Sequence, residues 1–368
     1  MLAELALEPR PAGSAAEARA RERCAARLRE LGFEVSEQPF TYSALPGRWG
    51  TPAAGVTAGL VLAGAGVLGA SDRAAAALAL LAGAGAALAL VGGWAARHGV
   101  LTLPALRARA VNLVAERGGP PIGVPRVWLV AHLDSKSQPV PIGLRAAGIA
   151  GTALAFIAAA GVATAQLLGL PAAGWWAPLS GVGVLAAVPV ALTTVGARSA
   201  GAVDNASGVA AVLDAAARVP AGVALGVLLT SAEELGLAGA RAWARTLPPS
   251  IALNCDGVDD DGALVAMYSG RVPTAVLQAL AAAAATAGQP LQARRLVPGI
   301  LTDGVALADA GWAVATLSRG TRATLRRIHT PRDDLAHLAG RGIEPAARVL
   351  AAAATALGGI HPPLTDEA

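Results

Sequence analysis

Four long uncharged runs constrain this chain more than any other feature. Residues 49–71 and 74–96 contain no charged residue, and residues 146–195 form a longer uncharged stretch that Pro171 divides in two. A bilayer core about 30 Å thick needs roughly 20 apolar residues in a helix. Buried helices of soluble proteins normally carry a polar stripe instead. The pattern therefore favours four membrane spans over four buried helices of a soluble protein.

The breaks between the runs group the spans into two hairpins. Asp72 and Arg73 separate the first pair, and Pro171 separates the second. We expect one transmembrane hairpin at residues 48–97 and another at residues 146–196. Tryptophan gathers at membrane interfaces, and four tryptophans lie near the expected span ends: Trp49, Trp94, Trp175 and Trp176.

Outside the hairpins, short β-rich runs alternate with helical stretches. Residues 14–32 read as an amphipathic helix that begins with a serine cap. Strands that alternate with helices at this spacing indicate an α/β domain. We expect a doubly wound, mostly parallel sheet flanked by helices, with both hairpins inserted into it. Three segments then make up one domain: residues 1–47, 98–145 and 197–368.

Residue types that bind metals follow several of the predicted strands. They are His132 and Asp134, Glu233 and Glu234, and Asp256, with Asp204 ahead of a helix and His329 near the C-terminus. Taken singly, each has an ordinary interpretation as a turn, a helix cap or a solvated helix start. In open α/β sheets, ligands bind outside the carboxyl ends of the strands. Their joint placement therefore favours a metal site.

Seven short motifs occur in an order that resembles a known family. They are NLVAE, AHLDS, GAVDNASGVA, TSAEELGLAGA, NCDG, TDGVALADAG and HTPRDD, and they span residues 111–335. The pattern resembles the di-zinc exopeptidase family of bacterial leucyl aminopeptidases and glutamate carboxypeptidases. This resemblance implies a zinc exopeptidase-like fold and two zinc ions per chain.

The resemblance also implies a role for each residue of the constellation. His132 and Asp256 correspond to ligands of one zinc ion, Glu234 and His329 to ligands of the other, and Asp204 to the bridging carboxylate. Glu233 corresponds to the general base, and Asp134 to the acid that orients His132. The chemistry agrees, because two divalent ions about 4 Å apart need a bridging anion. A carboxylate outside the ligand set is needed to accept the proton of the attacking water.

The chain departs from the family pattern in two ways. About 70 residues separate Asp134 from Asp204, where relatives have a short loop, and the second hairpin accounts for this insertion. The neighbour of the last histidine is Ile328, where many relatives carry an oxyanion-stabilising tyrosine. The substrate-binding residues are therefore unassigned. Weak candidates are Tyr268 or Arg322 for the oxyanion and Lys136 for a substrate carboxylate, although Lys136 also reads as an ordinary exposed lysine.

The leading functional interpretation is a membrane-integral, zinc-dependent aminopeptidase that hydrolyses short peptides. A carboxypeptidase or a glutaminyl-cyclase-like enzyme on the same scaffold stays open, as does a non-catalytic, membrane-anchored peptide-binding module. The expected partners are a short peptide and the lipid bilayer. Basic residues form no dense cluster with interleaved aromatics, which argues against nucleic acid. The sequence leaves the oligomeric state open.

Charges beside the spans predict the orientation in a cell membrane. Arginines flank the spans on the side of the α/β domain, whereas the opposite loops carry only Arg73, paired with Asp72. Such an excess marks the cytoplasmic side. The two cysteines lie far apart, which fits a reducing compartment. We expect four spans, with the catalytic domain and both termini in the cytoplasm.

Overall fold

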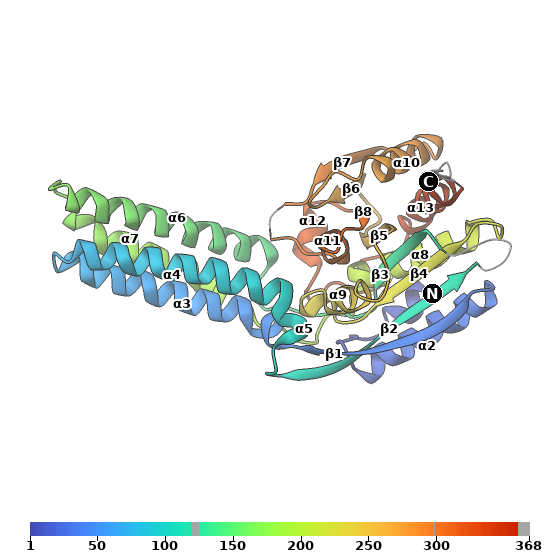
Figure 1. The fold of residues 1–368 in the computed structure, drawn as a ribbon, viewed down its shortest axis with the longest axis horizontal. Coiled ribbons are helices and arrows are strands. Elements are labelled where there is room, and N and C mark those ends of the chain that lie inside the picture. Colours follow the sequence, from blue (N-terminus) through green and yellow to red (C-terminus); the bar gives the residue numbers. More distant parts are fainter. Residues whose placement is uncertain (119–124, 298, 360–368) are drawn as a thin grey trace, which may run out of the picture. The chain divides into compact units, whose positions relative to one another are not determined.

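An eight-stranded sheet organises the part of the chain that carries the predicted site (Figure 1). The computed structural model describes residues 1–118, 125–297 and 299–359. The chain divides into two units, of which the first comprises Met1–Tyr42, Arg107–Ser137 and Ala197–Ala368. The second unit comprises Ser43–Leu106 and Gln138–Gly196. We call them the α/β unit and the helical unit.

The strand order across the sheet is β1-β2-β4-β3-β5-β8-β6-β7. The strands are β1 (Glu34–Ser43), β2 (Arg107–Arg117), β3 (Val127–His132), β4 (Leu225–Thr230), β5 (Ile251–Val258), β6 (Leu264–Tyr268), β7 (Leu291–Arg295) and β8 (Ala313–Arg319). The central strands β4, β3, β5 and β8 are parallel to one another. The pairs β2–β4 and β6–β8 are antiparallel. The mostly parallel α/β fold predicted from the sequence is confirmed.

Helices cover both faces of the sheet. One layer contains α2 (Ala15–Glu30), α8 (Gly208–Arg218), α10 (Thr274–Thr286) and α13 (Ile343–Gly358). The other contains α9 (Ala238–Trp243) and α11 (Asp303–Asp309). Short helices α1 (Leu2–Leu5) and α12 (Arg322–Arg327) complete the unit, with single turns η3 (Ala202–Ser207) and η4 (Glu233–Leu235).

Strand β3 shows why its sequence reads as an uninterrupted apolar run. All six of its residues are buried, because alternate side chains enter the two layers. Leu129 belongs to the larger core beneath α8 and α13, whereas Trp128 belongs to the smaller core beside α9 and α11. In the smaller core, the rings of Trp128 and Trp243 lie 4.7 Å apart in an edge-on arrangement. Burial on both faces is typical of central parallel strands.

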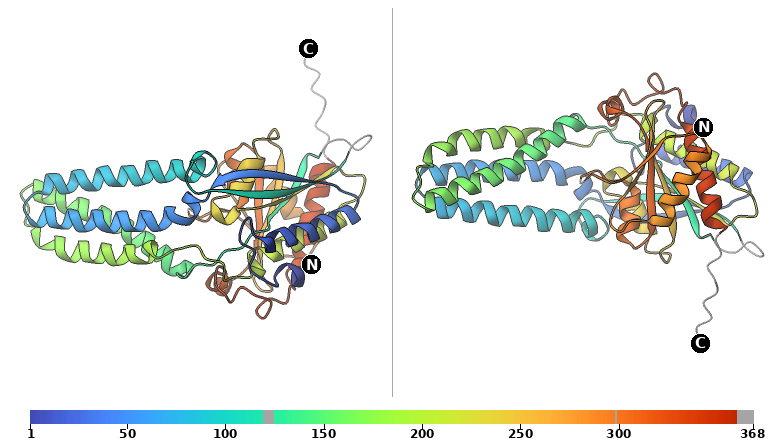
Figure 2. Two further views of the ribbon diagram at one scale, coloured as in Figure 1. Left: turned by 90° about the horizontal axis from the view of Figure 1, so that it is seen from below. Right: turned by 90° about the horizontal axis from the view of Figure 1, so that it is seen from above.

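The helical unit contains four helices that are long and apolar enough to cross a membrane. They are α3 (Leu45–Ala70), α4 (Ala74–Trp94, continued through η1, Ala95–Gly99, and α5, Val100–Thr102), α6 (Ile142–Leu167) and η2–α7 (Ala173–Trp175 and Trp176–Ala191). Figure 2 shows them side by side as a bundle. Both α3 and α6 begin ahead of the uncharged runs, so Arg48 and Arg145 lie in the first turns.

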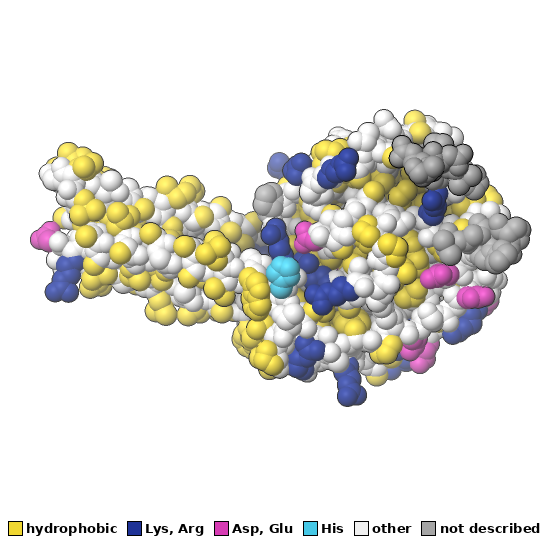
Figure 3. Space-filling view, in the orientation of Figure 1, with side chains coloured by type: hydrophobic (Ala, Val, Ile, Leu, Met, Phe, Trp, Pro, Cys, Tyr) yellow, Lys and Arg dark blue, Asp and Glu magenta, His cyan; other side chains and the backbone are white. Residues whose placement is uncertain are grey.

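Small residues allow these helices to approach closely. A Cβ atom at Gly69 would lie 1.9 Å from the Trp176 ring, and the Trp176 indole donates a hydrogen bond of 2.5 Å to Gln166. Along the length of the helices, the outward-facing side chains are mainly apolar (Figure 3). They include Leu60, Leu90, Ile157 and Leu185, which are 69%, 73%, 70% and 71% exposed. Glycine at helix contacts and leucine on the outside is the distribution found in membrane bundles.

Candidate metal centre

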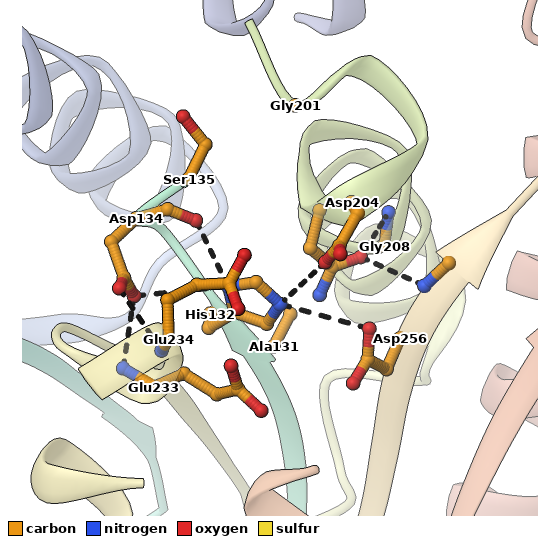
Figure 4. A network of polar contacts seen from close by, with 12 residues as sticks. Ala131, His132, Asp134, Ser135, Gly201, Asp204, Gly208, Glu233, Glu234 and Asp256 are labelled. Carbon is orange, nitrogen blue, oxygen red and sulfur yellow. Dashed lines mark hydrogen bonds and ion pairs between the residues drawn. The ribbon is translucent and has the colours of Figure 1, made fainter. Parts of the chain in front are cut away.

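The predicted metal-binding residues converge at the carboxyl ends of the central strands (Figure 4). His132 is the last residue of β3, and Asp256 lies near the end of β5. Turn η4 follows β4 and carries both Glu233 and Glu234. Turn η3 leads into α8 and carries Asp204. Because β3, β4 and β5 run parallel, their ends meet at one edge of the sheet, as expected for a ligand site in this class of fold.

His132, Asp204 and Asp256 form the first group of potential ligands. The Nε2 atom of His132 lies 3.1 Å from Oδ1 of Asp204 and 3.6 Å from Oδ1 of Asp256. In Figure 4 all three side chains point toward one another. Imidazole nitrogen and carboxylate oxygen are both zinc ligands, so this arrangement offers one nitrogen and two oxygens to an ion.

Asp204, Glu234 and His329 form the second group. The Nε2 atom of His329 lies 2.9 Å from Oδ2 of Asp204 and 3.3 Å from Oε1 of Glu234. Asp204 therefore faces His132 with one carboxylate oxygen and His329 with the other. That is the geometry required of a carboxylate that bridges two ions.

Two buried atoms without a hydrogen-bond partner also indicate that these residues could hold a cation such as zinc. Oε1 of Glu234 and Nδ1 of His329 are buried and, among the described residues, have no hydrogen-bond partner. A buried polar atom without a partner is costly, and a cation in the second group would satisfy the carboxylate oxygen. The first and second groups together also concentrate three carboxylates in a buried site, which a divalent cation would neutralise.

The charges of the site perturb its titrating groups. Burial opposes the charged form of His132, but the surrounding carboxylates, led by Glu233, raise its pKa well above the usual value. Burial also raises the pKa of Glu233 well above its usual range. The pKa of Asp204 is lowered despite burial, because His132 and His329 both donate to it. The pKa values of two carboxylates of the site are thus shifted in opposite directions, which is common at catalytic sites.

Asp134 connects two of the strand ends. Its main-chain oxygen lies 3.0 Å from Nδ1 of His132, whereas its Oδ1 atom is 3.7 Å from the same nitrogen. The carboxylate accepts the main-chain N–H groups of Glu233 at 3.1 Å and Glu234 at 3.2 Å. Asp134 thereby holds the turn that carries both glutamates, a task that its position in the sequence did not reveal.

Three further residues that sequence reasoning missed support the same loops. Asp333 accepts the N–H groups of Val203 at 2.7 Å and Asp204 at 3.2 Å, and burial raises its pKa to about 6. Arg10, only 2% exposed, donates to the main-chain oxygens of Leu133 and Gly201, among others. Asp303 is also buried, accepts a hydrogen bond from the Thr230 hydroxyl, and has its pKa raised to about 7 by burial. Asp303 and Asp333 lie within the motifs TDGVALADAG and HTPRDD, so the sequence offered a signal for both. Arg10 lies outside all seven motifs, and the sequence offered no signal for it.

The weak substrate-binding candidates occupy different places. Lys136 is part of the site, because its Nζ atom lies 2.6 Å from Oε2 of Glu234. Tyr268 ends β6 and lies beneath the guanidinium of Arg295, which is 5.6 Å from the ring centre. Arg322 is exposed at the start of α12. Neither Tyr268 nor Arg322 belongs to the two groups of potential ligands.

Histidines and carboxylates that could hold metal ions thus gather at the carboxyl edge of a largely parallel sheet, an arrangement typical of metallohydrolases. The model of peptidase family M28 matches residues 183–354. This match confirms the resemblance found in the motifs and supports a metallopeptidase. A comparison with curated proteins gave no match.

Solved structures share the fold at low sequence identity. An aminopeptidase from Aneurinibacillus sp. strain AM-1 is 15% identical, with a TM-score of 0.56 over 97% of this chain and 92% of that one. BSAP, a zinc aminopeptidase from Bacillus subtilis, is 17% identical, with a TM-score of 0.54 over 96% and 92%. A glutaminyl cyclase from Fimbriiglobus ruber is 15% identical, with a TM-score of 0.52 over 96% and 92%.

Proposed function

We propose that this chain is a membrane-integral aminopeptidase that uses two zinc ions to hydrolyse short peptides. The observation that carries the proposal is the placement of Asp204, whose two carboxylate oxygens face two different histidines. Each histidine has a further carboxylate beside it, which supports two ions that share one bridging ligand. His132, Asp204, Glu234, Asp256 and His329 would hold the metals.

The residues around the metals suggest the mechanism. Zinc bound in these groups would lower the pKa of a water molecule and polarise the peptide carbonyl. Glu233 lies next to a proposed ligand but belongs to neither group, and its carboxyl is buried. It would take the proton of the attacking water and return it to the leaving amine. Asp134 would keep Glu233 in place through the hydrogen bond to its main-chain N–H.

The two hairpins would fix this site to a membrane. We propose that residues 48–97 and 146–196 are transmembrane hairpins inserted into the peptidase domain, which comprises residues 1–47, 98–145 and 197–368. Support comes from the four apolar helices and from their exposed leucines and isoleucines. The arginines beside the spans favour a cytoplasmic catalytic domain.

Metal analysis and a substrate panel on the detergent-purified protein test the proposal. We expect about two zinc ions per chain and release of p-nitroaniline from amino-acid p-nitroanilides. Dipeptides should be cleaved, and the same dipeptides with acetylated N-termini should not. Cleavage regardless of acetylation would exclude an aminopeptidase. Cyclisation of N-terminal glutamine with one bound zinc would establish the cyclase instead.

A further inference from the structure

The single lysine of the chain is placed beside a proposed metal ligand. Lys136 is the only lysine in 368 residues, and its Nζ atom lies 2.6 Å from Oε2 of Glu234. The side chains of the pair are 16% and 5% exposed. The second oxygen of Glu234, Oε1, faces His329 at 3.3 Å. The two oxygens of Glu234 are therefore divided between a fixed ammonium and the metal group.

This ion pair makes the two metal groups unequal in charge. Both groups share Asp204, and each adds one further carboxylate. In the first group this carboxylate is Asp256, which contacts His132. In the second it is Glu234, whose charge is already balanced by Lys136. Like charges repel strongly where water is excluded, so an ion entering the second group meets the ammonium that is paired with Glu234. Among the described residues, no lysine or arginine forms an ion pair with Asp204 or Asp256 in the first group.

We propose that Lys136 is a counter-ion that competes with the metal for Glu234. It stabilises the metal-free site and makes the Asp204–Glu234–His329 group the weaker of the two metal sites. Lys136 is thus a positioning residue that acts through Glu234. This inference rests on the proposed two-zinc function.

Removal of the Lys136 charge should change two quantities in opposite directions: the stability of the metal-free protein should fall, and the affinity for zinc should rise. A buried carboxylate that loses its cationic partner is strongly destabilised. Without Lys136, the metal-free protein would therefore keep an uncompensated charge at Glu234. A bound ion would remove that penalty, so the variant should bind the ion more tightly while its metal-free form becomes less stable.

The decisive experiment compares Lys136→Met with Lys136→Arg in the full-length protein. Zinc affinities are measured by competition with a coloured chelator, and Tm is measured with and without zinc. In Lys136→Met, the second zinc ion should bind at least tenfold more tightly, the metal-free Tm should fall, and the zinc-loaded Tm should stay near the wild-type value. Lys136→Arg keeps the charge and should retain wild-type affinity.

A second variant and a second class of substrate distinguish loss of folding and substrate binding from competition with the metal. If metal-free Lys136→Met does not fold, Lys136→Gln keeps a hydrogen-bond donor without the charge and should still tighten the second zinc ion. Unchanged or weaker zinc binding in both variants overturns the inference. The inference is also overturned if zinc affinity is unchanged and KM rises for dipeptides but not for p-nitroanilides. Lys136 would then bind the carboxylate of the substrate. If the wild-type protein binds no zinc, the proposed function is overturned as well.

Discussion

A buried glutamate remote in sequence from the proposed metal ligands should make the stability of this protein depend on pH. Glu17 lies in the first turn of α2 and is 1% exposed. Its Oε1 atom accepts a 2.5 Å hydrogen bond from the Ser231 hydroxyl, and its Oε2 atom accepts a 2.6 Å bond from the Gly13 N–H. Burial, reinforced by the charge of Asp134, raises the pKa of Glu17 to about 8.

The direction of the effect follows from the proton balance. An unfolded glutamate with a pKa of 4.5 loses its proton well below neutral pH, whereas the folded protein keeps it until about pH 8. Between these values the folded state binds more protons, so stability falls as the pH rises. At about 1.4 kcal/mol per pH unit, the loss between pH 5 and pH 8 amounts to about 4 kcal/mol.

Glu17→Gln removes this titration and keeps both contacts. The amide oxygen can accept the Gly13 N–H, and the amide nitrogen can donate to the Ser231 hydroxyl. For a domain of this size, 1 kcal/mol corresponds to roughly 2–4 °C in Tm. The Tm difference between variant and wild type should therefore increase by about 8 °C or more, in favour of the variant, from pH 5 to pH 8. Thermal unfolding in detergent at both pH values measures this difference.

The matched control is Glu22→Gln, which alters an exposed carboxyl on the same helix. It should leave the pH dependence of Tm as in the wild type. Parallel Tm curves for Glu17→Gln and wild type from pH 5 to pH 8 would refute the reasoning, since Glu17 would then be ionised in the folded protein throughout that range.

The remaining predictions concern the metals, the base and the membrane. Asp204→Ala should abolish binding of two zinc ions, because neither histidine would keep the shared carboxylate; two ions in the purified variant, by metal analysis, would exclude the bridge. Glu233→Gln should retain zinc while turnover falls by about 10²-fold or more; loss of zinc with activity preserved would make Glu233 a ligand. A reporter active only outside the cytoplasm should be silent at the C-terminus and active in the loop at Asp72, and the reverse pattern would place the catalytic domain on the other side.

The sequence predicted those features that depend on local or periodic patterns of apolar and charged residues. Uncharged runs predicted the four apolar helices, and apolar runs that end in His132 or Asp256 predicted strands with polar side chains at their ends. Parallel strands bring such ends to one edge, so residues far apart in sequence could be expected to meet. The structure brings together the two histidines and the three carboxylates of the proposed ligand set.

The residues that sequence reasoning missed depend on tertiary contacts. Glu17 reads as an ordinary charge in an amphipathic helix, and nothing nearby indicates that its partner is Ser231. Arg10 resembles many other arginines of this chain, yet it is buried and donates to loops more than 120 residues away. Long-range hydrogen bonds of this kind leave no periodic pattern. The pairing of Lys136 with Glu234 was hidden for the same reason.

Contacts at the two ends of the proposed second insertion explain how the site would tolerate it. The chain leaves the α/β unit at Ser137 and returns at Ala197, and the N–H of Arg198 donates to the Ser137 hydroxyl at 2.9 Å. One step closer to the site, the Ser135 hydroxyl donates to the main-chain oxygen of Ser199 at 3.0 Å. The two ends of the insertion are therefore joined within the α/β unit itself. If the proposed insertion crosses a membrane, its two ends lie on the same side, so it must cross an even number of times. Two helices, α6 and α7, satisfy that requirement.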